Sequence, residues 1–506
     1  GLVWAKPRSS SGSNSLYDTE RGVQKALISN ASGGNQDDSG GGGTAGLYQF
    51  NSNGFSLGDN YGVAANSNNA DMVAWTFLKQ EGFFDIVSYT GNGSTDRRIA
   101  HNLGCNPGLL VVKRTDASGD WWTQHGTSND HYYKLNSTDA QTSDGSFWST
   151  TSFNSTEFGV GGTSNTNNIN GASYIAYLWA HGNDSASQIF GDDSDEAIIK
   201  TGSFTPTGSG TAKQTINLGF EPQWLLLKNA TSTQSGNWWI FDNMRGFTAG
   251  DGSGSAYLFA DTSAAESAFG AGSINITNQG FEMVNNAFVS SSQTFIYMAI
   301  RRGPMKEPSA GTDVYIADES HASAYENPMF QGTFPVDMSI FFEETSTDGP
   351  YFGSRLTGKG AMEIDQTLAL YNENNHVWDY MNGWYNRGSG SDANNIAHMF
   401  RRYPKVFDVV AYTGAGAGTH THNLKAVPEM MIIKNTSHSN RWIVYHSALG
   451  NNQQVHLDEN ITPTTGQFND TTPTASVFSV SNNTQSGTSG RTYVALLFAS
   501  LSGISK

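Results

Sequence analysis

The stretch FDIVSYTGNGSTDRRIAHNLG, residues 84–104, returns with changes as FDVVAYTGAGAGTHTHNLK at residues 407–425. A second element recurs beside it, a proline followed by an apolar run that ends in lysine in all copies but one: PGLLVVK at 107, PQWLLLK at 222, PVDMSIFF at 335 and PEMMIIK at 428. Self-similarity at a period of roughly 100 residues indicates one domain repeated along the chain.

Each copy continues through an aromatic stretch and closes on another apolar run, such as WWTQH at 121 and YIAYLWA at 174. The first residues of the chain fit the same frame, because GLVWAK at 1 matches GLLVVK and MVAWTF at 72 matches a closing run. We therefore expect five repeats, called units one to five below, the fourth being the most diverged: 1–80, 84–182, 195–303, 311–404 and 406–506.

The apolar runs are short, rich in Val, Ile, Phe, Tyr and Trp, and bounded by Gly, Asn, Asp and Ser, which is typical of β-strands. No segment of helical length shows a period of 3.6 residues. About 100 residues with six to eight strands per unit favour a sandwich over a propeller, whose blades have about 40–45 residues. The sequence predicts an all-β fold, a tandem array of about five β-sandwich (jelly-roll or lectin-like) repeats.

Composition excludes several classes of protein. The net charge is −17, with only 28 Lys and Arg in 506 residues, which argues against partners that are nucleic acids or anionic membrane surfaces. No apolar run approaches the roughly 18 residues of a membrane-spanning helix. The single cysteine, Cys105, allows no intrachain disulfide, and we expect it to be a small buried hydrophobe.

One motif invites an enzymatic interpretation. In EIDQTL, Glu363 and Asp365 match the Glu-x-Asp-x-x-Glu pattern of laminarinase-like glycosidases, whose carboxylates alternate along one strand. Leu368 stands where the acid/base would be, so we expect an acidic strand face and no enzyme. The sequence predicts no catalytic residue, no cofactor and no metal site. The acidic cluster DDSDE at 192 reads as a solvated linker, with calcium binding as the alternative.

Several polar motifs look structural. His101 and His422 fall in equivalent loops, but unit three has Thr215-Ile216-Asn217 where unit two has Ala100-His101-Asn102. We therefore expect these histidines to stabilise a turn or to face solvent. The turns DTERG at 18 and DNMRG at 242 predict an Asp–Arg pair beside a glycine with positive φ.

The tryptophans form repeated pairs. Trp121, Trp238 and Trp442 occupy equivalent places, and we expect these three to be core residues. Adjacent residues of a strand point to opposite faces, so Trp122 and Trp239 face away from their neighbours. The sequence leaves two alternatives for Trp122 and Trp239: each ring is packed under a loop, or it is exposed and stacks on sugars, which is a glycan-binding hypothesis.

Four stretches of the repeats follow a fixed order: YTGNGSTDRRIAHNLG, PGLLVVKR, WIVYHSALG and TYVALLFA. With these stretches, the repeats resemble the tandem repeats of structural proteins of tailed bacteriophages, marine ones especially, which are usually labelled tail fibre or tail protein. The resemblance extends over nearly the whole chain. It implies a non-enzymatic virion protein on the particle surface that contributes to host attachment, with other copies of itself, other virion proteins and host-surface glycan as partners. A carbohydrate-binding adhesin or lectin and a capsid decoration protein are the alternatives.

Unit one begins within a repeat, at GLVWAK, without the opening stretch that units two and five have. Either preceding residues or a strand from a neighbouring chain would complete it. We expect the first unit to contact something outside itself.

Overall fold

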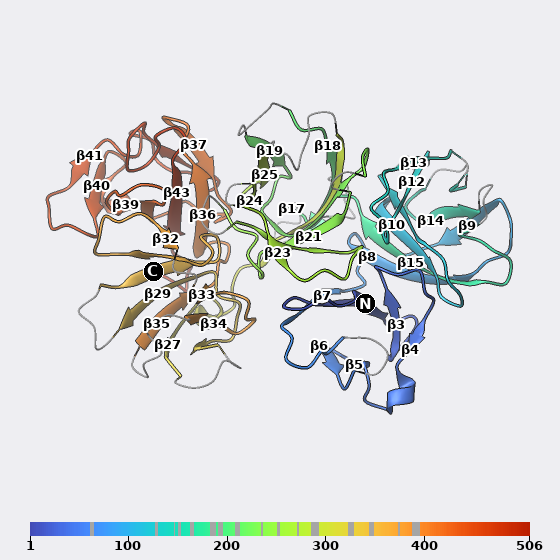
Figure 1. Cartoon of the computed structure of the whole chain (residues 1–506). Coiled ribbons are helices and arrows are strands. Elements are labelled where there is room, and N and C mark those ends of the chain that lie inside the picture. The colour runs from blue at the N-terminus through green and yellow to red at the C-terminus, as the bar shows by residue number, and fades with distance from the viewer. Residues whose placement is uncertain are drawn as a thin grey trace.

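The computed structural model describes most of the chain, in the following residues: 1–60, 65–126, 130–145, 147–149, 153–161, 166–182, 189–190, 196–207, 213–233, 236–249, 254–270, 273–284, 293–321, 328–343, 349–372, 375–386 and 395–506. These residues form antiparallel strands in separate sheets (Figure 1). Their helical parts are three short 3-10 turns, Ser39–Gly41, Gly311–Asp313 and Ser447–Leu449, and they contain no helix able to cross a membrane. The prediction of an all-β array of β-sandwich repeats is confirmed.

Units two to five each have a six-stranded sheet and a smaller second sheet. In unit two the large sheet has the order β13-β12-β11-β10-β15-β8 and the small sheet pairs β14 with β9. Its strands are β8 (Phe84–Thr90), β9 (Asp96–Ala100), β10 (Pro107–Arg114), β11 (Trp121–His125), β12 (His131–Lys134), β13 (Thr142–Ser143), β14 (Glu157–Gly161) and β15 (Ser173–Ala180).

Unit three has the large sheet β18-β26-β20-β21-β22-β23 and the small sheet β19-β25-β24. A two-stranded ribbon, β16 (Ile189–Phe190) and β17 (Glu196–Ala197), precedes it. Its strands are β18 (Ile199–Phe204), β19 (Lys213–Asn217), β20 (Pro222–Asn229), β21 (Trp238–Asp242), β22 (Ala256–Phe259), β23 (Ser267–Ala268), β24 (Ile274–Thr277), β25 (Gly280–Val284) and β26 (Phe295–Arg301).

Unit four repeats this plan as β27-β35-β29-β30-β31-β32 with β28-β34-β33, and unit five as β36-β43-β38-β39-β40-β41 with β37-β42. The strands of unit four are β27 (Tyr315–Glu319), β28 (Phe330–Gln331), β29 (Met338–Glu343), β30 (Tyr351–Ser354), β31 (Gly360–Glu363), β32 (Tyr371–Asn372), β33 (His376–Val377), β34 (Gly383–Asn386) and β35 (Asn395–Phe400). Those of unit five are β36 (Phe407–Thr413), β37 (Gly418–Thr421), β38 (Met430–Asn435), β39 (Ile443–His446), β40 (Gln453–His456), β41 (Thr464–Thr465), β42 (Val477–Val480) and β43 (Thr492–Phe498).

Unit one has the sheet β4-β3-β2-β1-β7 and a hairpin, β5-β6. Its strands are β1 (Leu2–Pro7), β2 (Ser15–Asp18), β3 (Lys25–Ile28), β4 (Gln36–Asp37), β5 (Leu47–Asn51), β6 (Gly54–Leu57) and β7 (Met72–Phe77). Among the described strands, none lies beside β7 where β8, β18, β27 and β36 stand in the other units. Within the chain, unit one contacts units two and three, and a contact with another chain stays a prediction.

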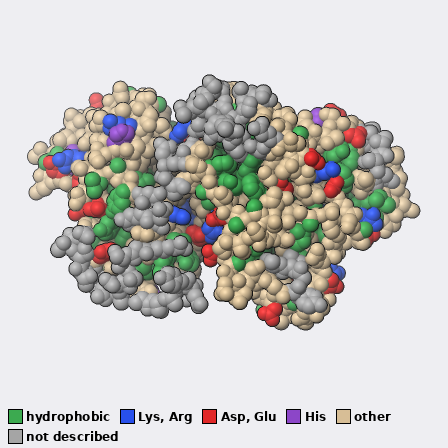
Figure 2. Space-filling model, viewed as in Figure 1, with side chains coloured by type: hydrophobic (Ala, Val, Ile, Leu, Met, Phe, Trp, Pro, Cys, Tyr) green, Lys and Arg blue, Asp and Glu red, His purple; other side chains and the backbone are tan. Residues whose placement is uncertain are grey.

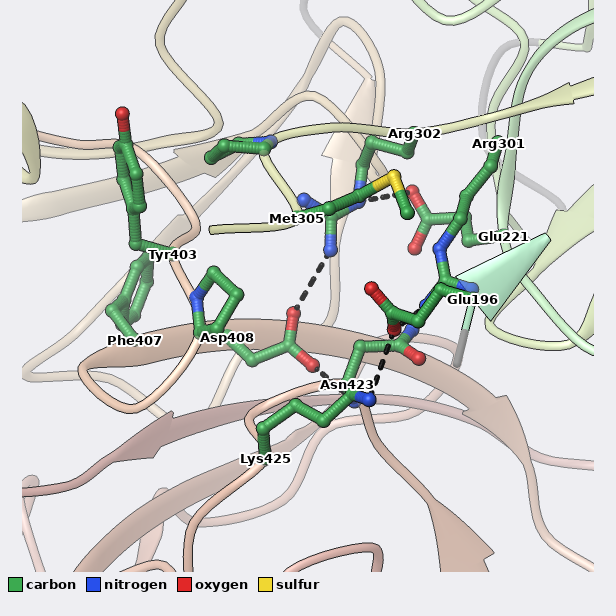
Figure 3. Close-up of a pocket in the computed structure, with 12 residues that line it drawn as sticks. Glu196, Glu221, Arg301, Arg302, Met305, Tyr403, Phe407, Asp408, Asn423 and Lys425 are labelled. Carbon is green, nitrogen blue, oxygen red and sulfur yellow. Dashed lines mark hydrogen bonds and ion pairs between the residues drawn. The ribbon is translucent and has the colours of Figure 1, made fainter. Parts of the chain in front are cut away.

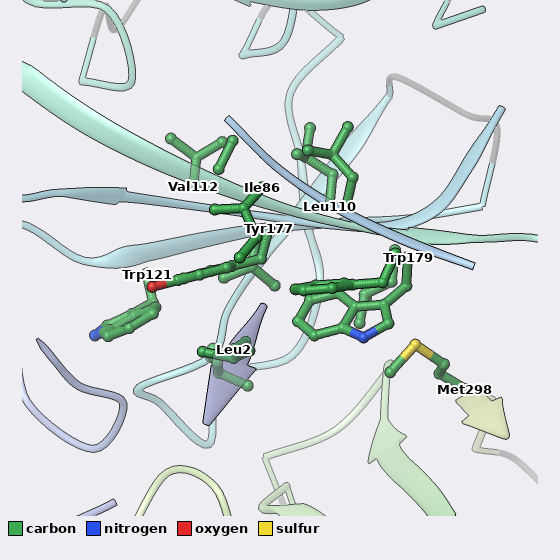
Figure 4. Packing of buried hydrophobic residues seen from close by; sticks show 14 of the residues in the cluster. Leu2, Ile86, Leu110, Val112, Trp121, Tyr177, Trp179 and Met298 are labelled. Atoms are coloured by element: carbon green, nitrogen blue, oxygen red, sulfur yellow. The ribbon is translucent and has the colours of Figure 1, made fainter. Parts of the chain in front are cut away.

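The large sheets of units one, two and three face one another around a shared core (Figure 4). In β10, Leu109 and Val111 point to the neighbouring units, whereas Leu110 and Val112 point into the sandwich of unit two. Both faces are therefore covered, which explains why these strands are continuous apolar runs without alternation. The core includes Trp179 of unit two and Met298 of unit three, both almost fully buried.

The contact between successive large sheets is built around the repeated lysine and tryptophan, and we call it the Lys–Trp joint. In unit two, Lys113 Nζ donates to the carbonyl of Ser32 in unit one at 3.0 Å. Trp121 Nε1 donates to the carbonyls of Ile28 and Ala31, also in unit one. The ammonium of Lys113 lies 5.8 Å from the ring of Trp121, within range of a cation–π interaction.

The same joint recurs where unit three meets unit two and where unit five meets unit four. Trp238 Nε1 donates to the carbonyl of Lys134 at 3.0 Å, and Trp442 Nε1 to that of Glu363 at 2.9 Å. Lys228 and Lys434 each donate to a carbonyl in the loop of the preceding unit, Ser137 and Gln366 respectively. Each tryptophan is at most 1% exposed, so the prediction that they are core residues is confirmed.

Unit one docks on unit three by the same contact and closes a ring of three units. Lys6 Nζ donates to the carbonyl of Thr262 at 2.9 Å. Asn14 stands in the place of the tryptophan, and its Nδ2 donates to Phe259 and Thr262 carbonyls. In all four joints a backbone N–H of the facing unit also donates to the carbonyl two residues after the lysine, as follows: Glu266 to Arg8, Asn35 to Thr115, Gln141 to Ala230 and Leu370 to Thr436.

Aromatic side chains reach across two of these joints to the predicted Asp–Arg turns. Asp18 pairs with Arg21 at 2.6 Å and also accepts from Tyr177 of unit two. Asp242 pairs with Arg245 at 2.5 Å and accepts from Trp75 of unit one. Gly22 and Gly246 follow at φ 86° and 106°, so the structural reading of both turns is confirmed.

Burial lowers the pKa of the joint lysines, Lys228 among them, to about 8. In the unfolded chain a lysine keeps its proton up to a pKa near 10.4. Between about pH 8 and 10 the unfolded state therefore binds more protons, and raising the pH stabilises the native state. We expect the wild-type melting temperature to rise over this range relative to Lys228→Met.

The control is Lys306→Met, at an exposed lysine outside the joints, whose melting curve should follow the wild type at every pH. A constant difference between wild type and Lys228→Met from about pH 6 to 10 would contradict the buried position of the ammonium.

Candidate functional site

The two residues of the glycan-binding hypothesis differ in exposure. Trp239 is only 3% exposed, because the small sheet of unit three covers that face of β21 and places the ring in the interior cluster with Phe281 and Met283. The alternative of an exposed ring that stacks on sugars is therefore wrong for Trp239. Trp122 is half-buried and packs edge-on against Tyr132, with ring centroids 5.3 Å apart, and glycan binding there stays a prediction.

The EIDQTL segment is not an acidic strand face. Strand β31 ends at Glu363, so Asp365 and Leu368 lie beyond it in an exposed loop. That loop receives Lys434 through the carbonyl of Gln366. Its role in the structure is to form one side of a Lys–Trp joint, which corrects the strand prediction.

The remaining predicted motifs have structural roles or lie outside the described part. His101 Nδ1 accepts from the N–H of Leu103, and His422 Nδ1 from that of Leu424, both at 3.2 Å. The turn-stabilising role of these histidines is thus confirmed. Of the DDSDE cluster, 192–195 lie outside the described residues, and Glu196 pairs with Lys425 at 3.1 Å.

A groove of about 520 Å³ opens where units three, four and five meet, within the usual size range of ligand sites. Unit three supplies the β24–β25 hairpin, and unit five supplies β36, β37 and β43, which face it in Figure 1. The lining is mainly neutral: Thr215, Ala249, Ile276, Thr277, Asn278, Glu282, Thr357, Leu370, Ala411, Tyr412, Thr413, His420, Thr436, Ser437, Thr492, Tyr493 and Val494.

Aromatic rings line the groove on the side of unit five. Tyr412 stacks on Tyr493 with centroids 5.2 Å apart, and the ring of His420 lies over Tyr412 at 3.9 Å. The hydroxyl of Tyr412 donates to the carbonyl of Ser486 at 2.8 Å, which fixes its ring. Within the described part of the chain, neither ring nitrogen of His420 has a hydrogen bond, so both can serve a ligand.

Hydroxyl and amide groups complete the lining. Thr436 Oγ1, just after β38, and Thr492 Oγ1, at the start of the neighbouring β43, lie 2.7 Å apart. Asn278, at the turn of the β24–β25 hairpin, reaches across and donates from Nδ2 to Thr421 Oγ1 at 2.6 Å. Hydroxyls both donate and accept hydrogen bonds, so this groove suits an uncharged ligand that is itself rich in hydroxyls.

Glu282 is the one carboxylate among the described residues that line the groove. It already accepts from Lys213 Nζ at 2.9 Å and from Asn275 Nδ2 at 3.0 Å. Hydrolysis of a glycosidic bond ordinarily needs two carboxyl groups facing the substrate. In this groove Glu282 is held by Lys213 and Asn275, and the other described polar groups of the lining are uncharged hydroxyls, amides and the His420 ring.

A second cavity, between units three and five, is lined largely by charged side chains, unlike the mainly neutral groove (Figure 3). Arg302 lies between Glu221 and Asp408, at 3.3 and 3.5 Å. Arg402 of unit four bonds Glu221 at 2.8 Å and Asp337 at 3.1 Å. Burial is the largest single influence and would raise the pKa of Asp337, but the positive charges of Arg402, Arg302 and Arg355 together outweigh it and lower that pKa.

The charges in this network are paired within it, because Arg302 and Arg402 each contact two carboxylates. A buried pair that loses one partner is strongly destabilised. The network therefore fixes the pair of units four and five against the ring of units one to three, and it thereby shapes the groove. We interpret this network as a structural contact between units.

Sequence reasoning missed the groove, although Tyr412 and His420 lie within the repeated opening stretch. Unit two has Ile99 at the position of His420, so the repeat pattern does not indicate a binding residue at that position. The groove exists because three units meet, and no pattern within one unit predicts that meeting.

Comparison with protein families gives one match. Residues 1–304 and 365–506 match the model described as Domain of unknown function (DUF7483). The unmatched residues fall mainly in unit four, which the sequence marks as the most diverged repeat. None of the curated proteins matches the chain.

The state of His420 can be measured directly. Burial lowers the pKa of His420 to about 4, whereas an unfolded histidine has a pKa near 6.5. We expect the imidazole signals in NMR spectra of the folded protein to stay those of the neutral ring from pH 7 to about 5. A midpoint near 6.5 in the folded protein would contradict the enclosed position of the ring.

Proposed function

The chain belongs to the DUF7483 family, and we propose that it is a non-enzymatic structural protein of a phage particle that helps attach the particle to its host. In this proposal the groove between units three, four and five binds neutral glycan of the host surface. The protein acts on the particle surface, together with other virion proteins, as part of a tail fibre or another tail component.

The groove carries this proposal. Its hydroxyl, amide and imidazole groups can bond sugar hydroxyls, and Tyr412 and Tyr493 hold the His420 ring in place beneath a ligand. The resemblance of the repeats to phage tail proteins supports the location. The described surface in Figure 2 is mostly neutral, with charged side chains in small scattered groups, which agrees with a particle exposed to an external medium.

Glycan-array screening of the whole chain, followed by calorimetry with the best glycan, tests the proposal. We expect His420→Ala to weaken binding at least tenfold, which corresponds to about 1.4 kcal/mol, because two hydrogen-bonding atoms leave the groove. His321→Ala is the matched control, since His321 is exposed in unit four and outside the groove.

Trp122→Ala distinguishes glycan binding in the groove from glycan binding at Trp122 of unit two. Loss of binding in Trp122→Ala with unchanged binding in His420→Ala would move the site to unit two and overturn the groove assignment. Absence of binding to any glycan would overturn the attachment role.

A further inference from the structure

The lysine position of the joint is filled differently in unit four. By strand pairing, Phe342 in β29 takes the place of Lys113 and Lys434, since it lies opposite Ile396 as they lie opposite Ile175 and Val494. The four joint lysines are 0% exposed, whereas Phe342 is 42% exposed. Pro350 stands where the other units have tryptophan or Asn14, so this face of unit four lacks the joint's polar donors.

The loop that would accept a joint lysine and tryptophan from another unit is uncovered in unit five, among the described residues. Leu457 takes the place of Leu135 and Ala260, because the N–H of each donates to the carbonyl of the preceding joint tryptophan. Leu135 and Ala260 are at most 4% exposed under the next unit, but Leu457 is 47% exposed and nearby Ile461 is 39% exposed. Among the described residues, no unit covers this loop.

Both uncovered faces, the one with Phe342 in unit four and the one with Leu457 in unit five, have lost polar groups of the Lys–Trp joint. Pro463 of unit five occupies the position of Gln141 and Leu370, just before the short outer strand, and a proline has no N–H to give across a joint. A standard unit docking there would leave a carbonyl without its donor. Phe342, which needs none, can pack on Leu457 and Ile461 without such a loss.

We call the face of a large sheet that points away from its own sandwich, as Val111 does, the inner face of the unit. The inner faces of units four and five are also incompletely covered. Ile340 and Ile432 are half-buried, whereas their equivalents in the ring, Val111 and Leu226, are 2% and 3% exposed. In the ring each inner face is closed by two other units. Units four and five close only one joint between them, so each has an open side.

From these observations we propose that unit four of one chain docks on unit five of a second copy, with Phe342 packed against Leu457 and Ile461. This contact is an apolar version of the Lys–Trp joint. Because it joins two different faces, it is heterologous, and copies of the chain assemble into a closed ring or an extending fibre. It concerns assembly alone and does not depend on glycan binding in the groove.

Sedimentation equilibrium of the whole chain over a range of concentrations tests the proposal. We expect the wild type to associate, and Phe342→Asp and Leu457→Asp each to remain single chains. Phe342→Lys restores the residue type of the other joints and should also abolish association. The control is Met381→Asp, which charges a residue that is 67% exposed outside both faces and should leave association unchanged.

Mixing the two aspartate variants gives the sharpest result. Phe342→Asp keeps an intact Leu457 loop, and Leu457→Asp keeps an intact Phe342 face, so the mixture should form heterodimers that grow no further. A single-chain mass for the wild type at every concentration, association that survives both substitutions, or a mixture that stays single chains would overturn the proposal. Circular dichroism and melting temperatures confirm that each variant is folded.

Discussion

The structure depends on a lysine that is buried at the boundary between two sandwiches. Lys113 and its equivalents cross that boundary to a backbone carbonyl of the facing unit, beside a tryptophan or asparagine that does the same. Burying an ammonium is unfavourable unless its hydrogen bonds are made, so the next unit must sit in one orientation. Repetition of this contact turns five similar sandwiches into a ring of three and a pair.

The orientation fixed by the joints creates the features between units. In the ring, three large sheets bury their inner faces in a common aromatic core, which one isolated sandwich could not do. The pair is held to the ring by the network of Arg302, Arg402 and Glu221. The groove with Tyr412 and His420 follows from that placement, so its function rests on the geometry of the assembly and not on any single unit.

The sequence alone predicts the units, their strands and the buried tryptophans, since these leave repeated side-chain patterns. It does not predict which units touch, because the acceptors of the joints are backbone carbonyls in loops of unlike sequence, at Ser32, Ser137 and Thr262. The groove was missed for the same reason. It also leaves the exposure of Trp239 open, because strand alternation says which face a ring takes but not whether a second sheet covers it.

Hydrogen exchange tests most directly the claim that the joints fix the units against one another. The amides to follow are the four backbone amides that donate across the joints, those of Asn35, Gln141, Glu266 and Leu370. These amides lie in loops and would exchange rapidly in separate sandwiches. If the joints persist in solution, their exchange is as slow as that of the central strands, such as β10. Rapid exchange at all four, with the central strands still protected, would mean that the units are independent domains and would contradict the account.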